Sequence, residues 1–408
     1  MNHIKGGAVR LINADFVNTA SDWTYGGFAP IKTRTIICAE RGMNQQSKAS
    51  LNSHLNSLDG LRGIAAMLVV ISHYVIETRY SIPLGAKIGS IGVMLFFSLS
   101  GFLMMHVTIG KPFDRTNVVT FWYRRFFRVV PLFLSAIIIL TLYQFIARYI
   151  GVSPVYLIFN QFTDLTVVLQ NITLLRGDII FWTIGPELLF YLLFPIFWYA
   201  KSKSTVQLIF VMCVVFMVQR LSGFWVNWDI NLTRLNIVIQ FFMIGSLAYC
   251  GWASSSWQNV DSKISNCLFV IVVCVFTIVC PGINELLYGV DILPSGFYDL
   301  YVHQPVLWIV IPAVVFAVAS SPIASKIIGS NSLRFLGTIS YSTYIWHYLV
   351  IKAAMVFRPH STFSWFAVFL LLVIPGVIAV SYLSYRYIER PLRLRRSYDA
   401  VKVVSASR

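Results

Sequence analysis

Long apolar runs constrain this chain more than any other feature. A transmembrane α-helix needs about 20 predominantly apolar residues, with a range of about 17–25. Ten runs of roughly that length follow one another, near residues 60–77, 88–109, 126–148, 179–199, 205–222, 235–252, 264–281, 303–320, 336–357 and 364–387. The sequence therefore predicts an all-α polytopic membrane protein with about ten transmembrane helices.

Composition supports this class. The chain is 57% hydrophobic and only 12% charged, whereas a soluble domain carries about 25% charged residues. A net charge of +16 could indicate nucleic-acid binding, but cytoplasmic loops of polytopic membrane proteins are also rich in Lys and Arg. A lipid bilayer is therefore the expected partner, and no nucleic acid is expected.

The positions of the basic residues predict an orientation. Of the 32 Lys and Arg residues, eight lie on one side of the expected spans and 24 on the side that holds both termini. By the positive-inside rule both termini are cytoplasmic. We expect a poorly ordered cytoplasmic tail over 1–55, a transmembrane domain over 56–392 and a basic cytoplasmic tail over 393–408. Residues 1–42 are interpreted as an upstream extension that activity does not need, because Met43 directly precedes the membrane part.

Two further features bear on organisation. Residues 154–176 are moderately apolar but interrupted by polar side chains, so they are interpreted as an interfacial or re-entrant segment rather than an eleventh span. The six cysteines show no paired-motif spacing, which favours small apolar filler over metal binding or disulfides. No metal site is expected.

An arginine and a histidine share the first apolar run. Arg62 and His73 are 11 positions apart, which is roughly 16 Å along a helix. We interpret Arg62 as marking the membrane face and His73 as lying near the midplane. A titratable group at that depth is a functional-site hypothesis by default, although a neighbouring helix could also satisfy it structurally.

Charged residues in two other apolar runs are candidates for the functional site. Arg125 and Arg128 share a helix face at the start of the third run, either as a positive-inside anchor or as a site for an anionic cytoplasmic ligand. Glu187 is taken as the only acid within an expected span. It is interpreted either as a structural ion pair or as an orienting partner for His73 at a comparable depth.

Small and aromatic residues mark two more stretches. Ser98 and Ser100 lie among glycines in residues 92–104, a composition typical of close helix packing that is also compatible with the wall of an acyl tunnel. His347 lies at mid-depth between tyrosines and a tryptophan, which favours a structural or substrate-contacting role over catalysis.

Together these stretches resemble acyltransferase family three, a family of integral-membrane acyltransferases. The resemblance covers residues 58–396 and rests on six motifs in the usual order. They are LDGLRGIAAMLVVISHY, GVMLFFSLSGFLM, RRFFRVVP, FWTIGPELLFY, ISYSTYIWHYLVI and YRYIERPLR.

The resemblance implies transfer of an acyl group, usually acetyl, from cytoplasmic acyl-coenzyme A to a hydroxyl of a cell-surface or exported saccharide. It also implies a multi-pass protein of the bacterial inner membrane. The family's essential histidine and the arginine before it fall on His73 and Arg62. Its arginine motif falls on Arg125 and Arg128, and its Trp…Glu motif on Trp182 and Glu187.

We therefore expect His73 and Glu187 to be catalytic and Arg62, Arg125 and Arg128 to bind acyl-CoA. Trp182, Ser98, Ser100 and His347 are expected to contact substrate. Pro186, before Glu187, departs from the family pattern and would tilt the helix. Some members carry an additional esterase-like domain, which this chain would have to obtain from another protein.

Two other classes stay open. A transporter or flippase of a glycan or glycolipid could use the same mid-membrane His and Glu, and a polysaccharide-export scaffold would need no chemistry. The sequence leaves open the acceptor sugar or glycolipid, the length of the acyl chain and the oligomeric state.

Overall fold

The computed structural model of the chain describes residues 45–78, 87–151, 164–177, 180–222, 231–280, 297–355 and 362–392. By their contacts the residues form two units, 1–42 and 43–408, and every described residue belongs to the second. Of the two expected tails, residues 1–44 and 393–408 lie outside the described residues. The first helix, α2, begins at Gln45, inside the segment expected as tail.

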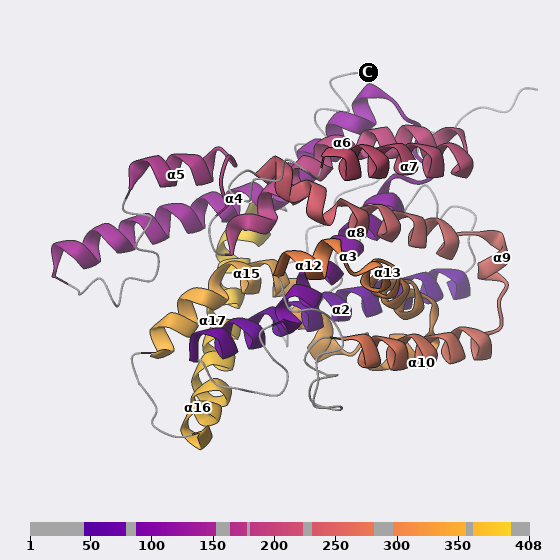
Figure 1. Cartoon of the computed structure of the whole chain (residues 1–408). Coiled ribbons are helices and arrows are strands. Elements are labelled where there is room, and N and C mark those ends of the chain that lie inside the picture. Colours follow the sequence, from indigo (N-terminus) through magenta and orange to yellow (C-terminus); the bar gives the residue numbers. More distant parts are fainter. Residues whose placement is uncertain are drawn as a thin grey trace, which may run out of the picture. The chain divides into compact units, whose positions relative to one another are not determined.

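The described residues are helical with short connections, and none of them forms a strand (Figure 1). The α-helices are α2 (Gln45–Thr78), α3 (Ile88–Thr108), α4 (Arg115–Tyr149), α5 (Leu165–Ile172), α6 (Ile184–Lys203), α7 (Thr205–Ser222), α8 (Asn231–Trp252), α9 (Ser255–Gln258), α10 (Ser262–Val279), α12 (Phe297–Val302), α13 (Pro305–Ser320), α14 (Pro322–Ile327), α15 (Asn331–Ala354), α16 (Thr362–Val368) and α17 (Ile374–Ser384). A 3₁₀ turn, η4 (Phe181–Thr183), precedes α6, and π-helical turns η7 (Phe369–Val373) and η8 (Tyr385–Glu389) flank α17.

Seven helices in the described part are long and apolar enough to cross a membrane. They are Asn56–Thr78, Ile88–Thr108, Arg115–Tyr149, Phe181–Lys203, Arg234–Trp252, Ser262–Val279 and Ser364–Leu392. The expected runs 205–222 and 303–320 form the shorter apolar helices Thr205–Leu221 and Pro305–Ser320. The all-helical class and the membrane-compatible helices are thus confirmed, while the count of ten stays a prediction.

Helix α15 is the expected span that hydropathy alone does not recover. It is 24 residues long, but its buried side includes Ser340, Ser342, Thr343 and His347. These polar residues lower its hydropathy, and burial against other helices makes them tolerable because they do not face lipid. Its polarity therefore indicates an internal helix.

The segment expected to be interfacial or re-entrant contains only one short helix among its described residues. Helix α5 has eight residues, too few to span a bilayer. The residues after it, Thr173–Leu175, line a largely apolar pocket together with Trp122 of α4 and Leu188 of α6. Residues 154–163 lie outside the described part.

Glycines allow the central helices to touch. A Cβ added at Gly337 of α15 would lie 1.8 Å from the carbonyl oxygen of Asp59 on α2. A Cβ at Gly101 of α3 would lie 2.0 Å from the carbonyl oxygen of Phe242 on α8. The prediction that small residues in 92–104 serve close packing is therefore confirmed.

Helices α2 and α15 run in the same direction. Asp59, about midway along α2, lies beside Gly337 near the start of α15, and Glu77 contacts Lys352 near the ends of both helices. This parallel pair is the element on which the candidate site is built.

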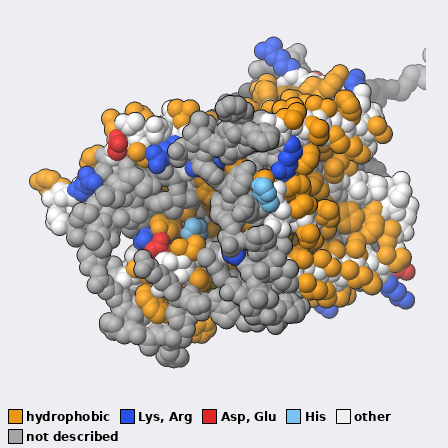
Figure 2. All heavy atoms as spheres, in the orientation of Figure 1, with side chains coloured by type: hydrophobic (Ala, Val, Ile, Leu, Met, Phe, Trp, Pro, Cys, Tyr) orange, Lys and Arg blue, Asp and Glu red, His pale blue; other side chains and the backbone are white. Residues whose placement is uncertain are grey.

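The lipid-compatible surface is extensive. Helix α10 leaves most of its side chains exposed, including Ile264, Val270, Ile271 and Ile278. Figure 2 shows hydrophobic side chains over much of the right half of the face in view. Such a surface suits contact with acyl chains rather than water.

Candidate active site

Three predicted arginines line one pocket within the helix bundle. The pocket has a cavity volume of about 70 Å³ and lies between α2, α3, α4, α6 and α15. Arg62 comes from α2, and Arg125 and Arg128 come from α4. Residues of α3, among them Phe97 and Leu103, supply an apolar wall. The pocket thus combines guanidinium groups with an apolar wall, which suits a ligand with an anionic part and an apolar part.

Arg125 is the most enclosed of the three, with 8% exposure. Its guanidinium donates to the carbonyl oxygen of Leu103 at 3.4 Å and lies 5.8 Å and 5.9 Å from the ring centres of Phe121 and Tyr191. Burying a cation is costly unless an anion accompanies it, and the carboxylate of Glu187 in the same pocket acts on Arg125. The neighbouring Arg124 is exposed.

A lysine outside the spans extends this basic region. Lys111 lies in the connection between α3 and α4. Burial, together with the charges of Arg124 and Arg125, lowers the pKa of Lys111 to about 8. The ammonium group is therefore only partly charged slightly above neutral pH.

Glu187 belongs to the arginine pocket. Its Oε1 accepts hydrogen bonds from the Tyr191 hydroxyl and, at 3.4 Å, from the Ser100 hydroxyl. Its charge also acts on Arg125. Among the described residues no hydrogen bond joins Glu187 to His73, so the expected pairing of these two groups is not what the structure forms.

Pro186 does not tilt the helix that carries Glu187. It lies in the first turn of α6, three residues after the N-cap Thr183. The backbone N–H groups of a first turn have no intrahelical partner, so a proline there costs no hydrogen bond.

His73 lies beside a second histidine rather than in the arginine pocket. The ring centres of His73 and His347 are 5.0 Å apart, and that of Tyr348 is 5.6 Å from His73 in an edge-on contact. In the span Asn56–Thr78, His73 is closer to the C-terminal end than to the middle. It is therefore further from the centre of its span than expected.

His347 is fully buried, and only one of its two ring nitrogens has a hydrogen-bond partner. Its Nδ1 lies 2.8 Å from the carbonyl oxygen of Tyr344, which assigns the proton to this nitrogen. Its Nε2 is buried and has no hydrogen-bond partner. Because unsatisfied buried polar atoms are rare, this nitrogen is available as a hydrogen-bond or proton acceptor.

Tyr344 connects the two regions. Its ring lies 5.9 Å from that of His347, and the same residue lines the arginine pocket. Its hydroxyl donates to the Ile180 carbonyl oxygen at 2.7 Å and accepts from the Thr183 hydroxyl at 2.9 Å. The pocket and the histidine pair are therefore separated by one tyrosine.

Of the remaining residues predicted to contact substrate, one lines the pocket and two do not. Ser100 lines the pocket, but Ser98 donates to the carbonyl oxygen of Phe241 and is enclosed between α3 and α8. The ring of Trp182 packs against Phe97 and Tyr301. Ser98 is thus a packing residue, and Trp182 supports the pocket wall at Phe97.

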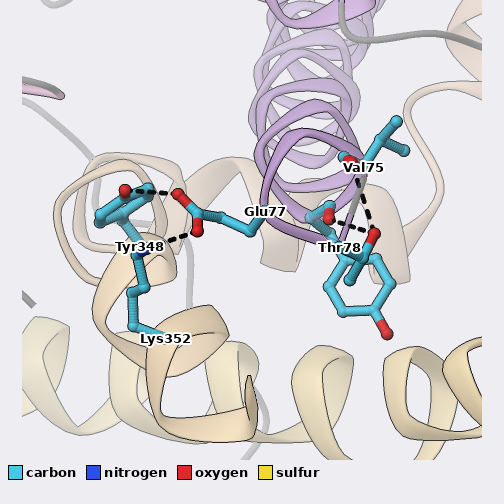
Figure 3. Close-up of polar contacts among 6 residues, drawn as sticks. Val75, Glu77, Thr78, Tyr348 and Lys352 are labelled. Atoms are coloured by element: carbon cyan, nitrogen blue, oxygen red, sulfur yellow. Dashed lines mark hydrogen bonds and ion pairs between the residues drawn. The ribbon is translucent and has the colours of Figure 1, made fainter. Parts of the chain in front are cut away.

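Sequence reasoning missed a polar cluster beside His73. Figure 3 shows Glu77 of α2 with Tyr348 and Lys352 of α15. Taking Glu187 as the only acid in a span was wrong, because Glu77 lies within the expected run 60–77. The signal was available, since Glu77 follows His73 by four residues and both share a helix face.

Comparison with known proteins identifies the family. Residues 55–386 match the model of a family described as an acyltransferase domain. The chain belongs to this acyltransferase family, and the resemblance found in the sequence is confirmed.

Individual relatives agree with this assignment. The chain is 25% identical over 379 residues to "Peptidoglycan O-acetyltransferase OatA" of Listeria monocytogenes, covering 83% of this chain and 56% of that protein. It is 22% identical over 367 residues to "O-acetyltransferase OatA" of Staphylococcus aureus, covering 83% and 57%. The chain thus spans just over half the length of these relatives. No solved structure matches it.

The described residues contain no group of three or more His, Cys, Asp or Glu side chains that could hold a metal ion. Among the described cysteines, Cys213 on α7, Cys250 on α8, and Cys267 and Cys274 on α10 are free thiols.

Proposed function

We propose that the protein is a multi-pass enzyme of the bacterial inner membrane that transfers an acyl group, most simply acetyl, from cytoplasmic acyl-CoA to a saccharide hydroxyl. The observation that carries this proposal is the arginine pocket next to the paired rings of His73 and His347, within a chain of the acyltransferase family. The excess of Lys and Arg on the side of both termini supports a cytoplasmic donor site.

The arginine pocket is the proposed donor site. Coenzyme A carries several phosphate charges, and guanidinium groups bind phosphate oxygens with paired hydrogen bonds. Arg62, Arg125 and Arg128 would hold these phosphates. The apolar wall would accommodate the pantetheine arm and the acyl group, directing the thioester past Tyr344 towards His73.

His73 is the proposed general base. Its neutral imidazole takes the proton of the acceptor hydroxyl as the hydroxyl oxygen bonds to the thioester carbonyl carbon. The carbon–sulfur bond then breaks, and the imidazolium proton passes to the departing thiolate, so that an ester and free CoA result. An alternative route passes the acyl group through His73 itself. The unpartnered Nε2 of His347 would accept a hydrogen bond from the protonated ring of His73 and so stabilise the imidazolium in either route.

Glu187 has a different proposed role from the one expected. Its contacts with Tyr191 and Ser100 support a function in fixing the donor pocket, because its charge balances the enclosed guanidinium of Arg125. Glu187 would therefore act on donor binding rather than on the orientation of His73.

The acceptor is proposed from the relatives. One of them is named for peptidoglycan, so a neutral N-acetylhexosamine glycan of the cell envelope is the first acceptor class to test. A transporter or flippase would share the buried histidines, but family membership favours acyl transfer.

The test is transfer from radiolabelled acetyl-CoA by purified protein in nanodiscs. Wild type should release free CoA together with labelled acetate or a labelled saccharide ester. His73→Ala should lose at least 100-fold in rate, the low end of what a general base contributes. His303→Ala, an exposed histidine, is the matched control. Full activity in His73→Ala would exclude the proposed role.

A further inference from the structure

The polar cluster of Glu77, Tyr348 and Lys352 is not used by the proposed donor site or base. Helices α2 and α15 each contribute one i,i+4 pair to it, His73 with Glu77 and Tyr348 with Lys352. The side chains of Glu77, Tyr348 and Lys352 meet across the two parallel helices (Figure 3), and the ring of His73 lies against that of Tyr348. The cluster therefore adjoins the proposed base directly.

Its internal contacts are specific. The Tyr348 hydroxyl donates to Glu77 Oε1 at 2.5 Å, and Lys352 pairs with Glu77 Oε2. The ammonium of Lys352 also lies 5.4 Å from the centre of the Tyr348 ring. The side chains of Glu77 and Lys352 are 17% and 30% exposed, so an incoming ligand can reach them.

The cluster lies on the far side of the histidine pair from the arginine pocket. Along α15, Tyr341 and Tyr344 line that pocket, His347 lies beside His73, and Tyr348 and Lys352 follow. Along α2, Arg62, His73 and Glu77 succeed one another in the same order. A donor held by the arginines leaves this opposite side of His73 for the second substrate.

Helix pairing alone does not account for the ion pair. A part-exposed ion pair contributes little to stability, and apolar residues could join the two helices as well. The carboxylate accepts hydrogen bonds, the ammonium group donates them, and the phenol hydroxyl does both. That combination matches hydroxyl groups, which also donate and accept.

We propose that Glu77, Tyr348 and Lys352 form the acceptor site, which binds a neutral saccharide and presents one of its hydroxyls to His73. Because Glu77 and Lys352 balance each other in charge, the site favours uncharged sugars over sugar phosphates. This proposal rests on the proposed function, from which it takes the positions of donor and base.

The experiment measures binding of chitotriose, a neutral N-acetylhexosamine oligomer, to the full chain in nanodiscs, alongside binding of CoA. Wild type should bind both. Glu77→Gln and Lys352→Met should each weaken chitotriose binding at least tenfold while the CoA affinity stays within twofold. Glucose 6-phosphate should not compete with chitotriose.

Thr78→Val is the matched control, because the Thr78 hydroxyl donates to carbonyl oxygens of its own helix, those of Tyr74 and Val75. It should bind chitotriose as wild type does. The proposal is overturned if wild type does not bind chitotriose, if either cluster variant binds it within twofold of wild type, or if CoA binding falls in parallel, which would indicate a structural clamp. Failure of CoA binding in wild type would instead contradict the proposed donor site.

Discussion

At the residue scale, the polar groups of this protein differ in whether the fold already satisfies them. Ser98 has its acceptor at Phe241 and serves packing. Arg125 bonds to the Leu103 carbonyl oxygen and to the side chain of Tyr191, and the charge of Glu187 acts on it. These contacts do not use all five N–H donors of a guanidinium. His347 keeps Nε2 without a partner. Among the described residues with an unsatisfied buried polar atom, His347 is the one that lies beside the proposed base.

Donor binding should depend on pH through Lys111. Because the pKa of Lys111 is lowered to about 8, its positive charge is largely present at pH 7 and largely lost at pH 9. Affinity for the polyanionic donor should therefore fall severalfold over this interval. Acetyl-CoA binding to the His73→Ala protein, where turnover does not interfere, measures this effect.

The corresponding variant removes the titrating group. Lys111→Met should bind donor more weakly at pH 7 and show a flatter pH dependence, while Lys263→Met, an exposed lysine on α10, should behave as wild type. An unchanged pH dependence in Lys111→Met would show that another group is responsible.

Some residue-level predictions succeeded because sequence spacing sets which positions share a helix face. The spacing of Arg125 and Arg128 predicted that they act together, and both line the pocket. The pairing of His73 with Glu187 was inferred from depth alone. Depth does not specify the direction in which a helix presents a side chain, and α6 presents Glu187 to α3 and α4 instead.

At the element scale, the α2–α15 pair determines the site, and its closeness depends on glycine. Gly337→Ala would place a methyl group within 1.8 Å of the Asp59 carbonyl oxygen, so the helices must separate. We expect a loss of about 1–3 kcal/mol in stability, as for other overpacked interiors. The loss of stability is measured as a lower thermal midpoint in detergent, with the fraction of folded protein after heating determined by size-exclusion chromatography.

Gly251→Ala is the matched substitution, since its nearest neighbour would be the Phe316 ring at an ordinary 3.5 Å. Its thermal midpoint should stay close to that of wild type. Equal stability of the two variants would contradict the close contact between α2 and α15.

At the scale of the whole molecule, apolar helices of the described part surround a polar centre. Sequence runs predicted the apolar helices well because lipid contact imposes length and hydropathy on each helix separately. They could not predict which helices meet, since that depends on side-chain fit between distant segments such as Gly101 and Phe242.

The proposed orientation has a direct test. In a protein whose native cysteines are replaced, His303→Cys should react with an impermeant maleimide in intact spheroplasts. Asn259→Cys, an exposed position between α9 and α10, should react only after permeabilisation. The reverse labelling pattern would place the arginine pocket on the outer face and remove the proposed access for cytoplasmic acyl-CoA.

The polarity of α15 also has a consequence for biogenesis. A segment that carries serines, a threonine and a histidine on its buried side gains little by entering lipid alone. Its transfer from the translocon into the bilayer should therefore wait for partners made long before it, α2 above all. The helix that carries most of the proposed chemistry would be among the last to reach its place during synthesis.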